Sequence, residues 1–294
     1  TTASLTDGQN LNFAAPVTEV RRMLSQPART RKLWKGVSYL EEERSVYTDW
    51  QHDPASRAAL ASLRKAREHW LAKRYQEAID TVNEPRASIP RELEYLAHYT
   101  LASAHSGIAW DHLRRAGSKR DLARNNSFNT ALKELAATVA LKPDFAPAYA
   151  DLFRLHYLVD HFPEALVAAD TLVKLVPSCA EAYCHRGNSY CNLDRPLPGI
   201  RDFKTSIDLD PKGGRNHGLA HYDLARAYLD ARQHQDCIEC CKKAVQVGYP
   251  RVFCYQVMGL ALKDAGDYKA ALEAFETARA DIGGGNPIAD DLDR

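Results

Sequence analysis

"ALKPDFAPAY" at residues 140–149 is followed by "LVPSCAEAY" at 175–183 and "DLDPKGG" at 208–214, so that Pro143, Pro177 and Pro211 lie 34 residues apart. Between these prolines the apolar residues follow one helical spacing, then a turn, then a second helical spacing. A 34-residue period with two helices indicates a repeat array in which stacked hairpins bury a continuous core. The sequence therefore predicts an all-α fold.

Small residues recur at two places within this period, one late in the first helix and one in the second. Two antiparallel helices approach to about 8–10 Å only where a small side chain lets their backbones come close. The first place is filled by Ala66, Ala102, Gly187, Ala225 and Gly259, with Phe153 as the departure. The second is filled by Ala78, Ala131, Ala165, Gly199, Cys237 and Ala271. With these residues the chain resembles the tetratricopeptide repeat family over about residues 57–282. The resemblance implies a right-handed α-solenoid of about six helix hairpins.

Three parts of the chain are expected. Residues 1–56 do not follow the period and are predicted to form a helical cap on the first repeat. Residues 57–282 form the array, and residues 283–294 are a Gly-rich acidic tail or linker. One hairpin, at about residues 92–142, is predicted to be elongated because Ala78 and Ala131 lie 53 residues apart. We expect both of its helices to gain about two turns.

The resemblance implies that the working surface is the concave groove lined by the first helix of each hairpin. Carried over position by position, it selects the groove residues Tyr99, Arg154, Tyr157, Asn188, Cys191, Tyr222 and Arg226. Asn bonds a peptide backbone, Arg holds a carboxylate with two hydrogen bonds, and Tyr adds rigid contact area. The leading hypothesis is a protein–protein interaction scaffold or adaptor, co-chaperone-like, that binds a peptide or helix of another protein. The carboxylate clamp of some family members is not formed, because its positions hold residues such as His185, Leu219 and Asp223.

A basic tip on the elongated hairpin supports an alternative function. It carries Arg114, Arg115, Lys119, Arg120 and Arg124. Together with a basic run between Val20 and Leu40, this tip could serve a module that associates with nucleic acid. A solvated helix end is the simpler interpretation of the same residues.

A second alternative is a metal-dependent enzyme on a helical-repeat scaffold. His217 and His221 have the i,i+4 spacing of two ligands on one helical face, but the glutamate of a metalloprotease motif is absent. In "QDCIECCKKA" (235–244), Cys237 takes the small position of the repeat and Cys241 lies one turn later, so both are predicted to be core residues. No phosphate-binding loop, nucleophile elbow or zinc-finger spacing occurs. We expect no enzyme activity, no cofactor and no metal.

Composition sets the remaining expectations. The net charge is +1, so no global field favours nucleic acid or an anionic membrane. No apolar run approaches the roughly 20 residues that span a bilayer. The seven cysteines are not spaced as a disulfide framework. A cytoplasmic location is expected, with the nucleus as the alternative.

Overall fold

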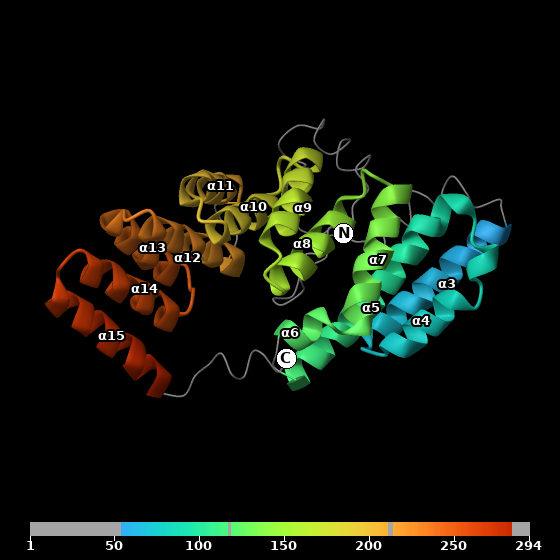
Figure 1. Ribbon diagram of the computed structural model, residues 1–294, viewed down its shortest axis with the longest axis horizontal. Coiled ribbons are helices and arrows are strands. Elements are labelled where there is room, and N and C mark those ends of the chain that lie inside the picture. The colour runs from blue at the N-terminus through green and yellow to red at the C-terminus, as the bar shows by residue number, and fades with distance from the viewer. Residues whose placement is uncertain (1–53, 117–118, 211–213, 284–294) are drawn as a thin grey trace. The chain divides into compact units, whose positions relative to one another are not determined.

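The computed structural model describes residues 54–116, 119–210 and 214–283, and within these ranges it contains helices and no strand (Figure 1). The α-helices are α3 (Pro54–Leu71), α4 (Tyr75–Asn83), α5 (Glu94–Ala116), α6 (Lys119–Ala123), α7 (Asn126–Leu141), α8 (Ala146–Leu158), α9 (Phe162–Leu175), α10 (Ala180–Asn192), α11 (Pro196–Leu209), α12 (Gly214–Asp230), α13 (His234–Gln246), α14 (Arg251–Asp264) and α15 (Tyr268–Gly283). Two 3₁₀ turns, η2 (Arg86–Ser88) and η3 (Arg91–Leu93), connect α4 to α5. The predicted all-α fold is confirmed.

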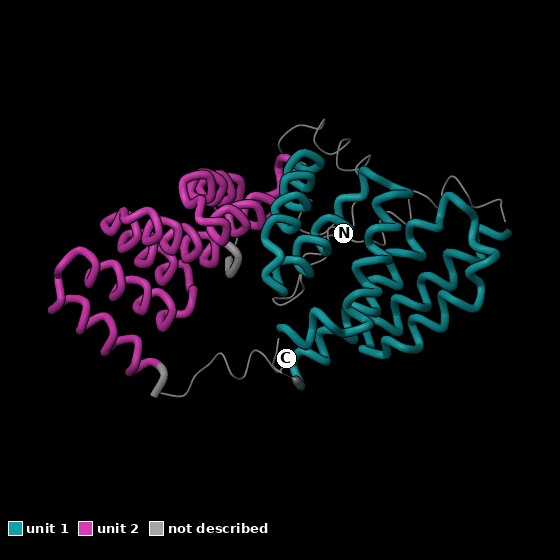
Figure 2. The backbone as a smooth tube through the Cα atoms, in the orientation of Figure 1, with its two compact units in different colours: residues 1–176 teal, residues 177–294 magenta. Residues whose placement is uncertain are grey.

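The described helices pair into six hairpins. The pairs are α3 with α4, α5 with α7, α8 with α9, α10 with α11, α12 with α13, and α14 with α15. They fall into two compact units of three hairpins each, divided between Val176 and Pro177 (Figure 2). The predicted cap and the acidic tail lie almost wholly outside the described residues. Of the predicted cap, residues 54–56 open α3.

A single turn geometry closes the first helix of five hairpins. Its central residue has a positive φ: 56° at Lys73, 62° at Asp160, 55° at Asp194, 58° at Arg232 and 86° at Gly266. The amide that follows donates to a carbonyl five residues upstream, as in His161 N–H to His156 O at 2.9 Å. This is the C-terminal helix cap in which one left-handed residue reverses the chain.

Pro143 and Pro177 lie just before the hairpins that begin with α8 and α10. The Tyr149 hydroxyl donates to the Pro143 carbonyl at 3.0 Å, and the Tyr183 hydroxyl donates to the Pro177 carbonyl at 3.2 Å. The same bond therefore fixes the entry into α8 in unit 1 and into α10 in unit 2. A repeated sequence has produced a repeated contact.

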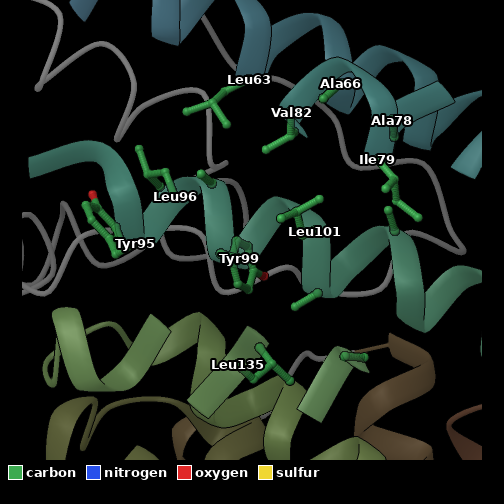
Figure 3. Packing of buried hydrophobic residues seen from close by; sticks show 14 of the residues in the cluster. Leu63, Ala66, Ala78, Ile79, Val82, Tyr95, Leu96, Tyr99, Leu101 and Leu135 are labelled. Atoms are coloured by element: carbon green, nitrogen blue, oxygen red, sulfur yellow. The ribbon is translucent and has the colours of Figure 1, made fainter. Parts of the chain in front are cut away.

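The core of unit 1 lies on both sides of α5. Figure 3 shows Leu63 of α3 and Val82 of α4 on one side of that helix and Leu135 of α7 on the other. These side chains, together with Leu96 of α5, are almost completely buried. Each such burial contributes about 1.5–3 kcal/mol relative to an exposed side chain.

The small positions of the repeat lie where paired helices meet, and every one of them is buried. A Cβ atom on Gly187 of α10 would lie 2.9 Å from the ring of Phe203 in α11. A Cβ on Gly259 of α14 would lie 2.7 Å from the ring of Phe275 in α15. In both hairpins a glycine on the first helix makes room for an aromatic ring on the second.

Phe153 reverses this arrangement. It departs from the small position on α8, yet it is 5% exposed and packs against Ala165, Ala168 and Ala169 of α9. Ala169 lies 34 residues before Phe203, so it occupies the same repeat position. The large and the small residue have exchanged helices, and the packed volume between the helices is preserved.

The buried cysteines of unit 2 belong to its core. Cys237 and Cys241 are 0% exposed on α13, as predicted, and Cys240 and Cys254 are also buried. Burial raises the pKa of Cys240 to about 11 and that of Cys254 to about 12. A hydrogen bond with Cys237, together with burial, raises the pKa of Cys241. The thiols of Cys240, Cys241 and Cys254 therefore stay protonated at neutral pH and behave as small apolar side chains.

The elongated hairpin differs from its prediction. The first helix, α5, is extended to 23 residues, but α7 has 16 residues and is no longer than α15. The expectation that both helices gain two turns is therefore wrong for the second helix. The five-residue α6 lies between them instead, and its Leu122 is completely buried. Leu122 therefore anchors the segment between α5 and α7 in the core of unit 1.

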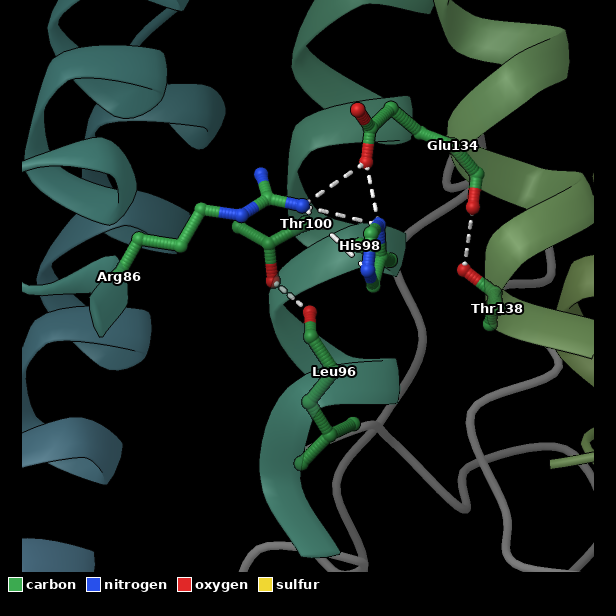
Figure 4. Close-up of polar contacts among 6 residues, drawn as sticks. All are labelled: Arg86, Leu96, His98, Thr100, Glu134 and Thr138. Carbon is green, nitrogen blue, oxygen red and sulfur yellow. Dashed lines mark hydrogen bonds and ion pairs between the residues drawn. The ribbon is translucent and has the colours of Figure 1, made fainter. Parts of the chain in front are cut away.

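A polar network joins η2, α5 and α7 (Figure 4). His98 Nδ1 lies 2.6 Å from Glu134 Oε2, and the Arg86 guanidinium lies 3.1 Å from the same His98 nitrogen. Arg86 is also 3.7 Å from Glu134. The three groups come from different elements, so they fix the connection before α5 against the hairpin. His98 is a structural residue here.

We predict that the pairing of Phe153 with Ala169 can be transferred to the α10–α11 hairpin. Gly187→Phe should destabilise unit 2 because the new ring overlaps Phe203, and Phe203→Ala should cost about 3–5 kcal/mol through its cavity. The double variant copies Phe153 and Ala169, and it should be more stable than the sum of the single effects by about 1–3 kcal/mol. Urea unfolding followed by circular dichroism measures the free energies. Gly187→Phe combined with Arg201→Ala, at an exposed position of α11, is the control. The volume exchange would be contradicted if Gly187→Phe had the same coupling energy with Phe203→Ala as with Arg201→Ala.

Candidate functional site

A pocket of about 670 Å³ lies within unit 1, between α3, α5 and α8 with the start of α4. Its lining includes six aromatic side chains: Trp70, Tyr75, Tyr99, Trp110, Phe153 and Tyr157. The volume falls within the range of pockets that enclose ligands or peptide side chains. It is the candidate functional site of this unit.

Its aromatic rings are held in place by the surrounding helices. Trp70 donates its indole N–H to the carbonyl of Ser103 at 3.1 Å. The Tyr75 ring lies against Gly107, where an added Cβ would come within 2.4 Å of it. Tyr157 packs between Phe153 and Phe162, at ring-centroid distances of 5.3 and 5.5 Å. Trp110 is 43% exposed, which makes it the ring most available to an incoming side chain.

Two aspartate–arginine pairs line the same pocket. Arg114 bonds Asp111 on α5, and Arg154 bonds Asp151 on α8, each with i,i+3 spacing. Burial raises the pKa of Tyr75, and Asp111 adds to this shift while Arg114 opposes it. The phenol is therefore in the field of the first pair. The pairs orient both guanidinium groups along the pocket wall.

Three of the predicted groove residues meet in this pocket. Tyr99, Arg154 and Tyr157 come from two successive hairpins and all line it. Tyr99 is only 7% exposed, and the edge of its ring packs on Phe145 at 5.0 Å, so it serves the core as well. The sequence analysis missed Trp70, Tyr75, Trp110 and the two aspartates. The repeated Asp-x-x-Arg spacing of 111–114 and 151–154 was the available signal.

The other predicted groove residues lie in unit 2. There the buried carboxylate of Asp223 interacts with two of them, Asn188 and Arg226. Asn188 Nδ2 donates to Asp223 Oδ2 at 3.0 Å, and Arg226 is close enough to Asp223 to lower its pKa. Burial dominates and raises the pKa of Asp223 to about 6. The Asn188 amide thus has an internal partner, and its bond to a peptide backbone stays a prediction. Asp223 was considered in the sequence only as a mismatch to the carboxylate clamp.

Tyr222 and Cys191 are held by their own neighbours in unit 2. Tyr222 stacks on Tyr249 with centroids 4.8 Å apart and lies 6.2 Å from Phe253. Burial raises the pKa of Cys191 to about 12, so its thiol is not a nucleophile at neutral pH. A Cβ on Gly199 would come within 2.6 Å of the Cys191 sulfur, which places this cysteine at the α10–α11 contact.

The basic tip is divided by its contacts. Arg114 lines the pocket, and Lys119 Nζ lies 2.8 Å from Asp160 Oδ1 in the turn after α8. Arg115, Arg120 and Arg124 are exposed. Arg114 and Lys119 are exposed as well, and the role of the tip as a docking site stays a prediction.

The two histidines considered as metal ligands contact each other. Their Nε2 atoms lie 3.2 Å apart on α12, and His221 is 8% exposed. Burial first, then His217 and Lys243, lower the pKa of His221 to about 4. In the part of the chain that the structure describes, no three or more metal-ligating side chains gather.

Residues 254–278 match the family model described as "Tetratricopeptide repeat". The chain contains a tetratricopeptide repeat. The matched residues cover most of α14 and α15, where Gly259 and Ala271 fill the two small positions. Five other described hairpins precede this one in the chain, and four of them have the same turn after their first helix.

Solved structures share the helical-repeat fold. A MamA structure from Desulfovibrio magneticus RS-1 is 19% identical, covers 63% of this chain and 97% of its own, and has a TM-score of 0.51. A second crystal structure of MamA is 21% identical over 59% of this chain and 94% of its own, with a TM-score of 0.49. No curated protein matches the chain. The tetratricopeptide repeat at residues 254–278 supports a protein-interaction scaffold. Among the described residues, no helix is long and apolar enough to cross a membrane.

We predict that Asp223→Asn stabilises unit 2 at neutral pH. The raised pKa means that the folded chain holds a proton up to about pH 6, whereas the unfolded chain loses it near pH 4. Ionised Asp223 therefore destabilises the fold above this window, and the amide should gain about 1–2 kcal/mol at pH 7.5 and nothing near pH 4. Urea unfolding at both pH values measures the gain, with Asp208→Asn on the exposed side of α11 as control. A loss of stability at pH 7.5 would contradict the prediction.

Acid should weaken the fold through His221. Between about pH 6.5 and 4 the unfolded chain binds a proton that folded His221 does not accept, so stability falls as the pH drops through this window. We expect His221→Gln to reduce the stability loss between pH 7 and pH 5 by about 2 kcal/mol. His161→Gln, at an exposed histidine, should leave the loss unchanged. The same pH profile in wild type and His221→Gln would refute the assignment.

Proposed function

We propose that this chain is a protein-interaction scaffold that binds a segment of a partner protein in the pocket of unit 1. The observation that carries the proposal is the meeting of Tyr99, Arg154 and Tyr157, selected by repeat register alone, in one pocket of about 670 Å³. Their positions belong to the first helices of successive hairpins, as in the concave groove of tetratricopeptide repeats. A co-chaperone-like adaptor would use such a groove.

The wall chemistry supports a peptide more than a reaction. Aromatic rings provide contact area with little loss of side-chain entropy, and the guanidinium groups provide fixed hydrogen-bond donors. Among the described residues, the lining holds no histidine and no cysteine, and its two carboxylates are paired with arginines. These features support binding, and they supply no nucleophile activated by a base.

The groove residues of unit 2 form a proposed second contact surface. Arg226 is exposed, and Phe253 beside Tyr222 is 37% exposed. An exposed arginine near stacked aromatic rings is the composition of many interface centres. The hydrogen bond between Asn188 and Asp223 joins α10 to α12 within this surface.

The proposed function predicts that partners depend on the unit 1 pocket. We expect Trp110→Ala and Arg154→Ala each to reduce capture of specific partners from a lysate of the source cells at least tenfold. Tyr268→Ala removes an aromatic ring that is 71% exposed and lies outside the pocket, and it should retain them. Quantitative mass spectrometry measures capture, and circular dichroism confirms that each variant is folded. The same partners at the same levels in all variants would refute the pocket as the binding site.

A further inference from the structure

One side of α15 exposes large apolar side chains. It carries Tyr268, Leu272, Phe275 and Arg279 at the helical spacing i, i+4, i+7 and i+11, and these four residues are called the α15 stripe. Tyr268 is 71% exposed and Leu272 is 59% exposed. The Phe275 ring is half-buried and lies against Gly259 of α14. Two large side chains one turn apart are therefore left open on the last described helix.

The same side of the second helix is covered in the earlier hairpins. The position of Leu272 holds an aliphatic residue in all six second helices, namely Ile79, Leu132, Leu166, Ile200, Ile238 and Leu272. In the first five of these hairpins the residue is buried or half-buried. The corresponding stripe of α13, which comprises His234, Ile238, Cys241 and Val245, is likewise buried or half-buried along its whole length. The exposure of Leu272 thus follows from its place in the array and not from its residue type.

The first helix of the following hairpin provides this cover. Within the two units α5 packs on α4, α8 on α7, α12 on α11 and α14 on α13. In the last of these pairs Cys254 of α14 and Cys241 of α13 belong to one core cluster, and Ile238 packs against it. In the part of the chain that the structure describes, no hairpin follows α15. The packing of the earlier hairpins shows that the element that fits this side of a second helix is another helix.

The first helices of the array share small residues at two positions seven apart. In α5, α8, α10, α12 and α14 the first position holds Ala97, Ala148, Ala182, Ala220 and Cys254, and the second holds Ala104, Leu155, Ser189, Ala227 and Ala261. All of these side chains are buried, and Leu155 is the large one among them. Small side chains let two helices approach to about 8–10 Å. A helix that covers the α15 stripe in the same way needs small residues at these two positions.

The helix at the other end of the described array lacks this composition. Repeat register places Ala61 and Glu68 of α3 at the two positions, and both are exposed. Glu68 stands where the later first helices have a buried residue. Stacking α3 of a second copy on α15 would bury this carboxylate against Leu272, and burial of a charge is costly unless the charge is paired. The composition therefore favours a helix of another protein over a second copy of this chain.

We propose that the α15 stripe binds an amphipathic helix of another protein that carries small residues seven positions apart. The helix packs on α15 as α14 packs on α13, and its small residues make room for Leu272 while its neighbouring apolar residues cover Tyr268. Recognition of an amphipathic helix by an apolar surface commonly uses anchors at this helical spacing. The stripe belongs to unit 2, so this binding is independent of the pocket in unit 1.

A displayed library of helical peptides about 18 residues long, randomised along one face, tests the composition of the ligand. Selection on the full chain, with counter-selection on Leu272→Asp, isolates peptides whose binding depends on the stripe. We expect alanine, glycine, serine or cysteine at two positions seven apart, with apolar residues beside them. Leu197→Asp is the matched control, because Leu197 is 57% exposed on α11 and lies outside the stripe. If no peptide depends on Leu272, or if large side chains are selected at both positions, the inference fails.

Synthetic versions of the selected peptides separate the stripe from other sites. Leu272→Asp should weaken their binding at least tenfold in fluorescence anisotropy, whereas Leu197→Asp and Trp110→Ala should not change it. Replacing the two small residues of the peptide with leucine should also weaken binding at least tenfold, because the helices can no longer approach. Equal binding of the leucine peptide would overturn the inference. Loss of binding in Trp110→Ala would overturn it as well, and would support the pocket of unit 1 as the binding site.

Sedimentation velocity tests a second copy of the chain as the occupant. We expect the wild-type chain and Leu272→Asp to sediment as the same species at every concentration. A wild-type chain that self-associates, and that becomes monomeric in Leu272→Asp but not in Leu197→Asp, would overturn the inference in favour of an interface between copies.

Discussion

The close approach of the two helices in each hairpin is the constraint on which the rest of the structure depends. It is met by filling a fixed volume rather than by a fixed residue at each position. In the α10–α11 hairpin Gly187 lies against Phe203, and in the α8–α9 hairpin Phe153 lies against Ala169. An interior packed at nearly crystalline density allows this exchange because the sum of the two side chains, not the identity of either, must fit. The other face of each first helix is left to vary.

Much of the fold could be predicted from the sequence because its information is local and repeated. The 34-residue interval between prolines and the two small positions each occur several times, so one ambiguous repeat such as that of Phe153 did not mislead the whole assignment. The insertion after Ala102 has no second copy, and there the prediction failed. Nothing in its composition distinguishes two longer helices from one long α5 followed by the short α6, because the choice depends on Leu122 finding a buried site in unit 1.

The candidate site was less predictable for a related reason. Repeat register selected Tyr99, Arg154 and Tyr157, since a groove position is defined by the helix on which it lies. Trp110, Asp111 and Arg114 lie on the part of α5 that exceeds the usual helix length, so register assigns them no role. The free-energy cost of ionising Asp223 could not be predicted from the sequence either, because the burial of an aspartate depends on tertiary packing.

The irregular part of the array and its pocket are therefore one feature. A regular first helix in this chain, such as α8 or α10, has 13 residues, whereas α5 has 23 and carries three pocket residues in its final turns. The first helices of unit 2 have 13, 17 and 14 residues, and there Asn188 of α10 bonds Asp223 of α12. The additional length of α5 places Trp110, Asp111 and Arg114 on the pocket wall, at positions where a helix as short as α8 would already have ended.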